Sequence, residues 1–157
     1  MIDRQDFLDI VRLTPLVSID LLVRSPDDRL LMGLRLNVPA AGFWFVPGGR
    51  ILKDETIEDA FARISNVELG VAFSADQARL VGAFTHRYKT NFQRVEGIGT
   101  HYVVLAYEVI ADIDIADLPK DQHSHYRWIG ADDDTTRVHE NARVYFDALG
   151  IRPSSVV

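Results

Sequence analysis

Residues 48–71 constrain the fold more than any other part of the chain, and they read GGRILKDETIEDAFARISNVELGV. Thr56 is typical of a helix N-cap, and Asp59 follows it three residues later. The apolar side chains that follow have helical spacing: Ile57, Ala60, Phe61 and Ile64. Gly70 suits the left-handed residue that ends many helices. The segment therefore predicts an amphipathic helix between two glycine turns, with one acid, Glu68, on its apolar stripe.

Strand-like segments surround this helix. We expect strands over 16–23, 30–35, 78–88, 101–110 and 125–130, and a short strand within 40–49 that Pro47 and two glycines break. The turn SPDDR should join the first two strands as a hairpin, and helices should cover 6–13 and 137–149. The buried side of the last helix should comprise Val138, Ala142, Tyr145, Phe146 and Leu149. Because strands outnumber helices, we predict an α+β fold, an α/β/α sandwich with a mixed sheet between helices, as one domain over 1–157.

Charge and composition exclude several classes of function. A formal net charge of -6 argues against a broad nucleic-acid surface, although a small phosphorylated ligand needs only local arginines. The sequence has no apolar run near the ~20 residues that span a bilayer and no secretory signal pattern, so a cytoplasmic protein without a membrane partner is expected. Because cysteine is absent, any metal must bind oxygen or imidazole ligands, which favours Mg²⁺ or Mn²⁺ over structural zinc.

The spacing of Gly49, Glu55, Arg63 and Glu68, followed by Gly70, resembles the Nudix box, the loop-helix-loop metal motif of nucleoside diphosphate hydrolases. Two acids of the usual box are replaced. Ile64 and Val67 stand where typical members carry glutamate. Because positions 57, 64 and 68 project to nearly the same side of a helix at ~100° per residue, isoleucine replaces an acid on the metal face. With two carboxylates lost, the site should hold one divalent ion rather than a cluster.

Further segments resemble one branch of that family, the GDP-mannose mannosyl hydrolases: TPLVSID, FWFVPGGR, KDET, ELG, THYVVL and DQHSHYRW, in this order. The resemblance implies a Nudix fold and hydrolysis of GDP-mannose, with GDP-glucose as a further substrate. Water attacks the anomeric carbon of the sugar with inversion, and GDP and free hexose are released. The resemblance also implies a homodimer. Two alternatives stay open: an ordinary Nudix pyrophosphohydrolase that yields GMP and sugar phosphate, and a non-catalytic module that binds nucleotide sugars.

By the same resemblance, one Mg²⁺ ion, with Mn²⁺ as the alternative, is held by the Gly49 carbonyl, the Glu68 carboxylate and the Gln122 amide oxygen. His123 is the candidate general base, because an imidazole with a pKa near ~6.5 can accept the proton of water at neutral pH. His125 competes for that role. In a regular strand the two histidines face the same way, so spacing does not separate them, and the family pattern decides for His123.

Three arginines match positions that the family uses for the charge of the substrate and of the leaving group: Arg35, Arg50 and Arg63. Arginine suits phosphate because its donors form a fork; for Arg63 the alternative is a structural salt bridge. The resemblance assigns further contacts to sugar, diphosphate or base: Asp20, His86, Tyr102 and Phe7. Asp20 and Arg35 are the assisting catalytic residues. For Tyr102 the alternative is a packed tyrosine, and Phe7 either stacks on guanine or belongs to the core through its helical phase with Ile10 and Val11.

Overall fold

A central strand that is buried on both faces organises the sheet. A computed structural model of the protein describes residues 1–121 and 123–154. In it Leu16–Arg24 forms β1, whose residues 18–23 are all buried, as is typical of a central strand. β1 pairs in parallel with β6 (Thr100–Ile110) along one edge. Its other edge pairs antiparallel with β4 (Gly48–Arg50). The sheet is therefore mixed, as predicted.

The remaining strands extend the sheet on both sides of this pair. They are β2 (Leu30–Arg35), β3 (Trp44–Phe45), β5 (Arg79–Tyr88) and β7 (His123–Ile129). The order is β3-β2-β1-β6-β5, with β4 beside β1 and β7 beside β2. The short 3-10 helices η1 (Ala75–Gln77) and η2 (Ile115–Asp117) lie in the connections.

The expected hairpin between β1 and β2 forms for only one residue pair. The turn after Arg24 brings that residue opposite Leu30, and the two strands then diverge. Residues of β4 and the preceding Pro47 pair with this edge of β1 instead. The Leu21 N–H donates to the Pro47 carbonyl at 2.8 Å. β2 consequently pairs with β7 and β3. The sequence pattern of a hairpin identified the turn and both strands, but it could not show which neighbour satisfies the edge of β1.

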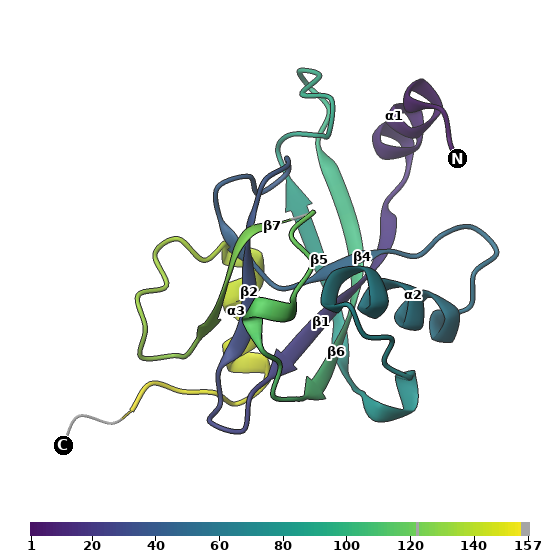
Figure 1. The fold of residues 1–157 in the computed structure, drawn as a ribbon. Coiled ribbons are helices and arrows are strands. Elements are labelled where there is room, and N and C mark those ends of the chain that lie inside the picture. The colour runs from purple at the N-terminus through teal and green to yellow at the C-terminus, as the bar shows by residue number, and fades with distance from the viewer. Residues whose placement is uncertain (122, 155–157) are drawn as a thin grey trace.

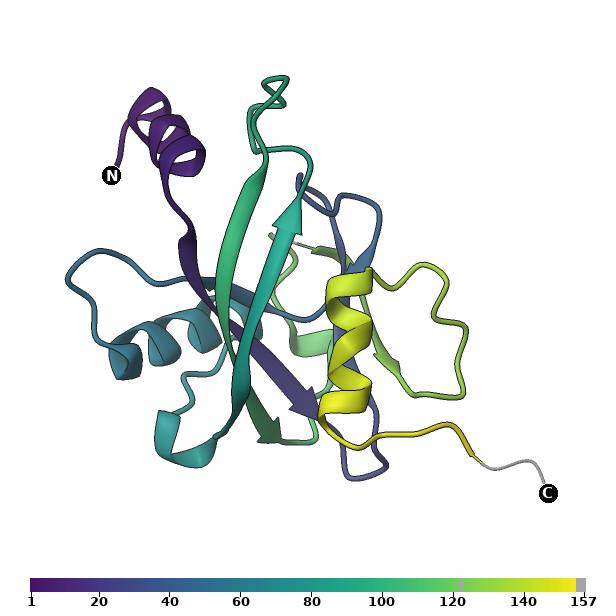
Figure 2. The ribbon, with the colours of Figure 1, turned by 180° about the vertical axis from the view of Figure 1, so that it is seen from behind.

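Helices cover both faces of the sheet, which confirms the predicted α/β/α arrangement (Figures 1 and 2). α2 (Ile57–Leu69) packs on one face through Ala60, Phe61 and Ile64. α3 (Glu140–Ala148) packs on the opposite face, where Figure 2 shows it in front of the sheet. All five residues predicted for the buried side of the last helix are buried: Val138, Ala142, Tyr145, Phe146 and Leu149. α1 (Arg4–Leu13) stands apart from these layers, above the end of the sheet (Figure 1).

The predicted ends of α2 are confirmed. The Thr56 hydroxyl accepts a hydrogen bond from the Asp59 N–H at 3.1 Å, and Gly70 closes the helix with φ of 73°. Ile57 departs from the expected apolar stripe, because its side chain in the first turn is exposed. None of the helices in the described part of the chain has the length and apolar character that a bilayer crossing needs.

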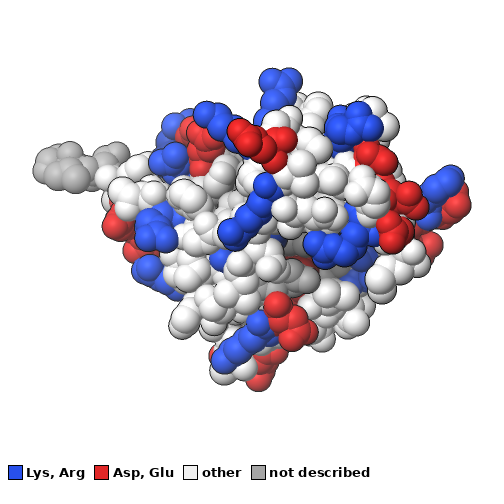
Figure 3. All heavy atoms as spheres, turned by 90° about the horizontal axis from the view of Figure 1, so that it is seen from above, with Lys and Arg blue, Asp and Glu red and all other residues white. Residues whose placement is uncertain are grey.

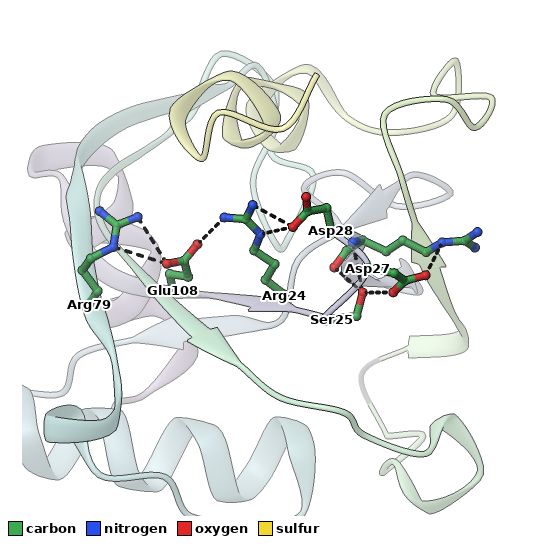
Figure 4. Close-up of polar contacts among 7 residues, drawn as sticks. Arg24, Ser25, Asp27, Asp28, Arg79 and Glu108 are labelled. Atoms are coloured by element: carbon green, nitrogen blue, oxygen red, sulfur yellow. Dashed lines mark hydrogen bonds and ion pairs between the residues drawn. The ribbon is translucent and has the colours of Figure 1, made fainter. Parts of the chain in front are cut away.

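An ion-pair network joins the strands at the lower end of the sheet in Figure 1, and Figure 4 shows it in detail. The buried carboxylate of Glu108 on β6 bonds to Arg24 of β1 at 3.1 Å and to Arg79 of β5 at 3.2 Å. Arg24 also forms an ion pair with Asp28 in the turn, at 2.7 Å. The network links three neighbouring strands, so it satisfies an acid that would otherwise be costly to bury.

Candidate active site

A cavity at the upper end of the sheet brings together six of the residues predicted from the sequence. They are Asp20, Arg35, Gly49, Arg50, His86 and Tyr102. They come from five strands, β1, β2, β4, β5 and β6. Figure 3 views the molecule from this side and shows basic side chains around a hollow. The sheet therefore assembles residues that are up to 82 positions apart in the sequence (102 − 20).

Two arginines give the cavity a positive charge that is available to a ligand. Neither Arg35 nor Arg50 forms an ion pair with any residue that the structure describes. Arg63 differs, because its guanidinium bonds both oxygens of Glu55, at 2.7 and 3.0 Å, and the Arg50 carbonyl at 2.9 Å. The pKa of Glu55 is lowered by this partner. Arg63 does not line the cavity and forms the structural salt bridge, and its contact with substrate stays a prediction.

Phe7 reaches the cavity only through Arg50. The Arg50 guanidinium lies 4.7 Å from the centre of the Phe7 ring, a cation–π distance. On its other side Phe7 packs against Phe92, with ring centres 5.0 Å apart. Phe7 is half-buried, whereas Leu8 and Val11 are the buried residues of α1. The guanine contact assigned to Phe7 stays a prediction, and in this structure its ring supports Arg50.

Asp20 lies at the floor of the cavity in a hydrogen-bonded group. Its Oδ2 atom accepts the Tyr145 hydroxyl at 2.5 Å, and the same hydroxyl is 3.4 Å from Nε2 of His86. Burial raises the pKa of Asp20 to about 7, against the smaller lowering effects of the Tyr145 hydrogen bond and the charge of Arg35. Burial also lowers the pKa of His86 to about 4, so this ring is neutral at pH 7.

Glu68 and His123 form a second buried pair beside β4, and neither of them lines the cavity. Glu68 Oε2 and His123 Nδ1 are 3.8 Å apart, and both side chains are almost fully buried. Burial raises the pKa of Glu68 to about 7, opposed more weakly by Arg35 and by the Gly48 backbone. Burial lowers the pKa of His123 to about 4, with a further contribution from Arg35. The imidazole is therefore uncharged at pH 7 and does not neutralise the carboxylate.

His123 packs directly on β2. A Cβ atom at Gly33 would lie 2.4 Å from Cγ of the His123 ring, so glycine at this position makes room for the imidazole. Neither ring nitrogen has a hydrogen-bond partner among the described residues. A buried imidazole without partners is costly, which is typical of a functional rather than a packing residue.

The expectation that His123 and His125 face the same way is wrong. His123 is buried, whereas His125 is exposed and has only Ser124 within hydrogen-bond distance, at 3.1 Å. Between the pairs Gly33–Tyr126 and Arg35–His123, β7 contains one residue more than β2. This β-bulge breaks the alternation of side chains along the strand. The bulge therefore distinguishes the two histidines, which strand periodicity alone could not do.

Comparison with known proteins identifies the family of the chain. A model of the NUDIX domain matches residues 14–148, which is most of the chain. The chain belongs to the Nudix family. This Nudix chain is 40% identical over 141 residues to the low-salt glycan biosynthesis protein Agl8 of Haloferax volcanii, and the match covers 89% of the chain and 85% of that protein.

Solved Nudix structures are similar over nearly the same span. The MutT NUDIX hydrolase from Burkholderia pseudomallei has a TM-score of 0.68 at 25% identity, covering 87% of this chain and 98% of that one. The NUDIX domain of Shewanella oneidensis NrtR, solved with ADP ribose, has a TM-score of 0.60 at 16% identity, covering 95% and 97%. The predicted fold and the predicted place among Nudix hydrolases are confirmed at this level.

The oxygen ligands that this Nudix chain offers suit a hard divalent cation. Glu68 is a buried carboxylate without a positively charged partner within ion-pair distance among the described residues, and such a group favours a bound cation. Gly49 lies in the neighbouring strand β4, where the Ile64 side chain packs on it: a Cβ atom at Gly49 would be 3.2 Å from Ile64 Cγ1. The third predicted ligand, Gln122, lies outside the described residues. No group of three or more His, Asp or Glu side chains with metal-binding geometry occurs in residues 1–121 and 123–154.

Sequence reasoning missed three residues of this Nudix site. Tyr88 lines the cavity but was treated only as part of a strand, and Tyr145 was assigned to the core. Gly33 carried no signal because its role depends on the neighbouring strand. A signal for Tyr145 did exist: a tyrosine on the buried side of a helix needs a partner for its hydroxyl, and Phe146 beside it does not.

Proposed function

We propose that this Nudix protein hydrolyses a GDP-hexose, GDP-mannose or GDP-glucose, at the anomeric carbon of the sugar. The observation that carries the proposal is the single acid on the face of α2 that meets β4. Glu68 is buried there, while Ile64 packs on Gly49 and Val67 is exposed. Attack on phosphorus with a cluster of cations needs more carboxylates than this face supplies. The similarity to a protein named for glycan biosynthesis supports a sugar-containing substrate.

Arg35 and Arg50 are suited to the diphosphate. Both line the cavity, and neither forms an ion pair with an acid among the described residues. Guanidinium groups stabilise the negative charge that develops on a departing GDP, so protonation of the leaving oxygen is not required. The substrate is thereby oriented with its diphosphate toward the arginines and its hexose toward the remaining walls of the cavity.

In the proposed step, the oxygen of water forms a bond to C1 of the hexose while the bond between C1 and the phosphate oxygen breaks. GDP leaves with the electron pair of that bond, and the proton of the attacking water passes to a ring nitrogen of His123. The neutral imidazole of His123 is the form that can accept this proton, and both of its nitrogens lack partners among the described residues. Attack from the face opposite to the leaving group inverts the anomeric configuration.

We further propose that Glu68 and the Gly49 carbonyl, together with Gln122, hold one Mg²⁺ ion, with Mn²⁺ as the alternative. When bound, such an ion supplies positive charge to the diphosphate of the leaving group. The chain contributes oxygen donors and an uncompensated buried acid beside the cavity. The homodimer implied by the sequence stays a prediction, which light scattering on the purified protein checks.

Hydrolysis in ¹⁸O-labelled water tests the proposal. Cleavage of the bond to C1 places the label in the hexose and none in GDP, whereas attack on phosphorus places it in a phosphate group. A panel of GDP-, ADP- and UDP-hexoses, each with and without Mg²⁺, identifies the preferred nucleotide. GMP and a hexose phosphate as the main products would show instead that the protein is a pyrophosphohydrolase. No turnover of any nucleotide sugar would favour the binding module.

A further inference from the structure

Three elements that are distant in the sequence meet at the hydroxyl of Tyr145. Tyr145 comes from α3, Asp20 from β1 and His86 from β5. The hydroxyl is 2.5 Å from Asp20 Oδ2 and 3.4 Å from His86 Nε2. Asp20 and His86 line the cavity, whereas Tyr145 lies behind them and is fully buried. Tyr145 can therefore act on a ligand only through its two neighbours.

The number of hydrogens at this junction fixes the direction of the main bond. Above the raised pKa of Asp20, about 7, its carboxylate is ionised and can only accept, so the one hydrogen of the tyrosine hydroxyl donates to it. The bond of 2.5 Å therefore runs from Tyr145 to Asp20 and occupies Oδ2. Oδ1 accepts no hydrogen bond from the described residues and lies close to Gly48, where a Cβ atom would be 2.7 Å away. One oxygen of the carboxylate is thus held, and the other remains able to accept a hydrogen bond from a ligand.

Packing alone does not explain a tyrosine at this position. The ring fills the core between the sheet and α3 and meets Phe84 edge-on, with ring centres 5.1 Å apart. A phenylalanine would provide the same ring contacts, and burying the hydroxyl of Tyr145 without a partner would cost about 1–3 kcal/mol. Its partner is Asp20, a buried acid that lines the cavity. The effect of the hydroxyl is therefore on the carboxylate rather than on the core.

The chemistry of the cavity indicates which part of the substrate Asp20 meets. A carboxylate repels a diphosphate, and Arg35 and Arg50 already suit that group. Neutral hydroxyls, in contrast, donate well to a carboxylate oxygen. Aromatic walls from Phe45, Tyr88 and Tyr102 suit the apolar faces of a sugar ring. Asp20 therefore fits a hydroxyl of the hexose.

We propose that Tyr145 is a positioning residue for hexose recognition: its hydroxyl fixes Oδ2 of Asp20 so that Oδ1 accepts a hydrogen bond from one hexose hydroxyl. The inference rests on the proposed function and adds to it a residue of α3 that does not touch the substrate. It assigns to the last helix a second role besides covering the sheet. It also predicts that sugar recognition and GDP recognition respond to different substitutions.

Tyr145→Phe tests the proposal, because it removes only the hydroxyl. The variant should lower kcat/KM for GDP-mannose about 10-fold or more, as expected when a hydrogen bond to a charged group is lost. The inhibition constant of GDP should change less than about twofold. Asp20→Asn keeps an acceptor for Tyr145 and should also leave GDP inhibition unchanged. Tyr107→Phe is the matched control, because Tyr107 packs on Phe61 on the other face of the sheet. Loss of the Tyr107 hydroxyl should leave kcat/KM for GDP-mannose and the inhibition constant of GDP unchanged.

A series of GDP-deoxyhexoses makes the test specific. For the analogue that lacks the hydroxyl bound by Asp20, the wild type and Tyr145→Phe should react at the same rate. An equal loss for every analogue, or wild-type kinetics of Tyr145→Phe in a protein that hydrolyses GDP-mannose, would overturn the positioning role and leave the proposed function intact. A wild type that neither binds nor hydrolyses any GDP-hexose would overturn both. Thermal unfolding of each variant confirms that kinetic losses are measured on folded protein.

Discussion

Replacing Gly33 with alanine tests whether the buried position of His123 matters. In the native structure the Cβ atom of the new alanine would lie 2.4 Å from Cγ, 2.5 Å from Cδ2 and 2.9 Å from Cβ of His123. Carbon atoms in contact are normally about 3.5–4.0 Å apart, so one of the two groups must move by roughly 1 Å or more.

Neither group has room to move. Gly33 is paired on both edges, with Phe45 of β3 and with Tyr126 of β7. His123 is 1% exposed and is bounded by Glu68 at 3.8 Å and by the Tyr126 ring, whose centre is 5.4 Å away. Overpacking of this kind costs about 1–3 kcal/mol. For a domain of this size that predicts a fall in Tm of about 2–12 °C.

The kinetic effect should be larger than the effect on stability. Because the clash displaces the proposed base, Gly33→Ala should lower kcat for GDP-mannose by about 10²–10⁴-fold at a temperature where the variant is folded. Differential scanning fluorimetry and an assay of released hexose measure the two effects. Gly82→Ala is the matched control in another strand, since its Cβ would meet Phe84 at 3.6 Å, an ordinary contact. Wild-type Tm and kcat in Gly33→Ala would refute the tight packing that the structure shows at His123.

Three other predictions use single substitutions at charged residues. In EDTA at about pH 8, above the raised pKa of Glu68, Glu68→Gln should raise Tm because it removes a buried charge without an ion-pair partner, and Mg²⁺ should raise the Tm of the wild type but not of the variant. Glu108→Gln should destabilise the protein by about 1–3 kcal/mol in urea unfolding, since it weakens the bonds to Arg24 and Arg79, and kcat should not change. The pKa of Asp20 is raised from 3.8 to about 7, so the folded state binds a proton that the unfolded state releases between these values, and the contribution of this group to stability falls as pH rises through them. The Tm of Asp20→Asn relative to the wild type should therefore increase from about pH 5 to about pH 8; an equal difference at both values would contradict the shifted pKa.

Features that depend on neighbouring residues in the sequence were predictable. The N-cap at Thr56, the left-handed Gly70 and the apolar spacing between them define α2 without reference to the rest of the chain. The buried side of α3 follows from the same periodicity. The mixed sheet was predictable in kind, because strand signals outnumber helix signals and short turns join many of them.

Features that depend on strand pairing were not predictable. The bulge that separates His123 from His125 exists because β7 pairs with β2, and this pairing brings together residues about 90 positions apart. The same holds for Gly33, whose missing side chain matters only when β7 lies beside it. Tyr145 was assigned correctly to the buried side of a helix, but its partner Asp20 lies 125 positions away.

The distribution of ion pairs distinguishes the cavity from the rest of the molecule. Away from it, buried or half-buried acids are matched by arginine: Glu108 by Arg24 and Arg79, and Glu55 by Arg63. Asp20 in the cavity wall and Glu68 behind the neighbouring strand β4 have only neutral histidines within ion-pair distance among the described residues. Folding alone would favour pairing these charges, since an uncompensated buried acid destabilises the native state. The lack of pairing between these acids and the arginines of the cavity is therefore explained by a ligand. An anionic part of the ligand pairs with the arginines, and a cation and hydroxyl groups pair with the acids.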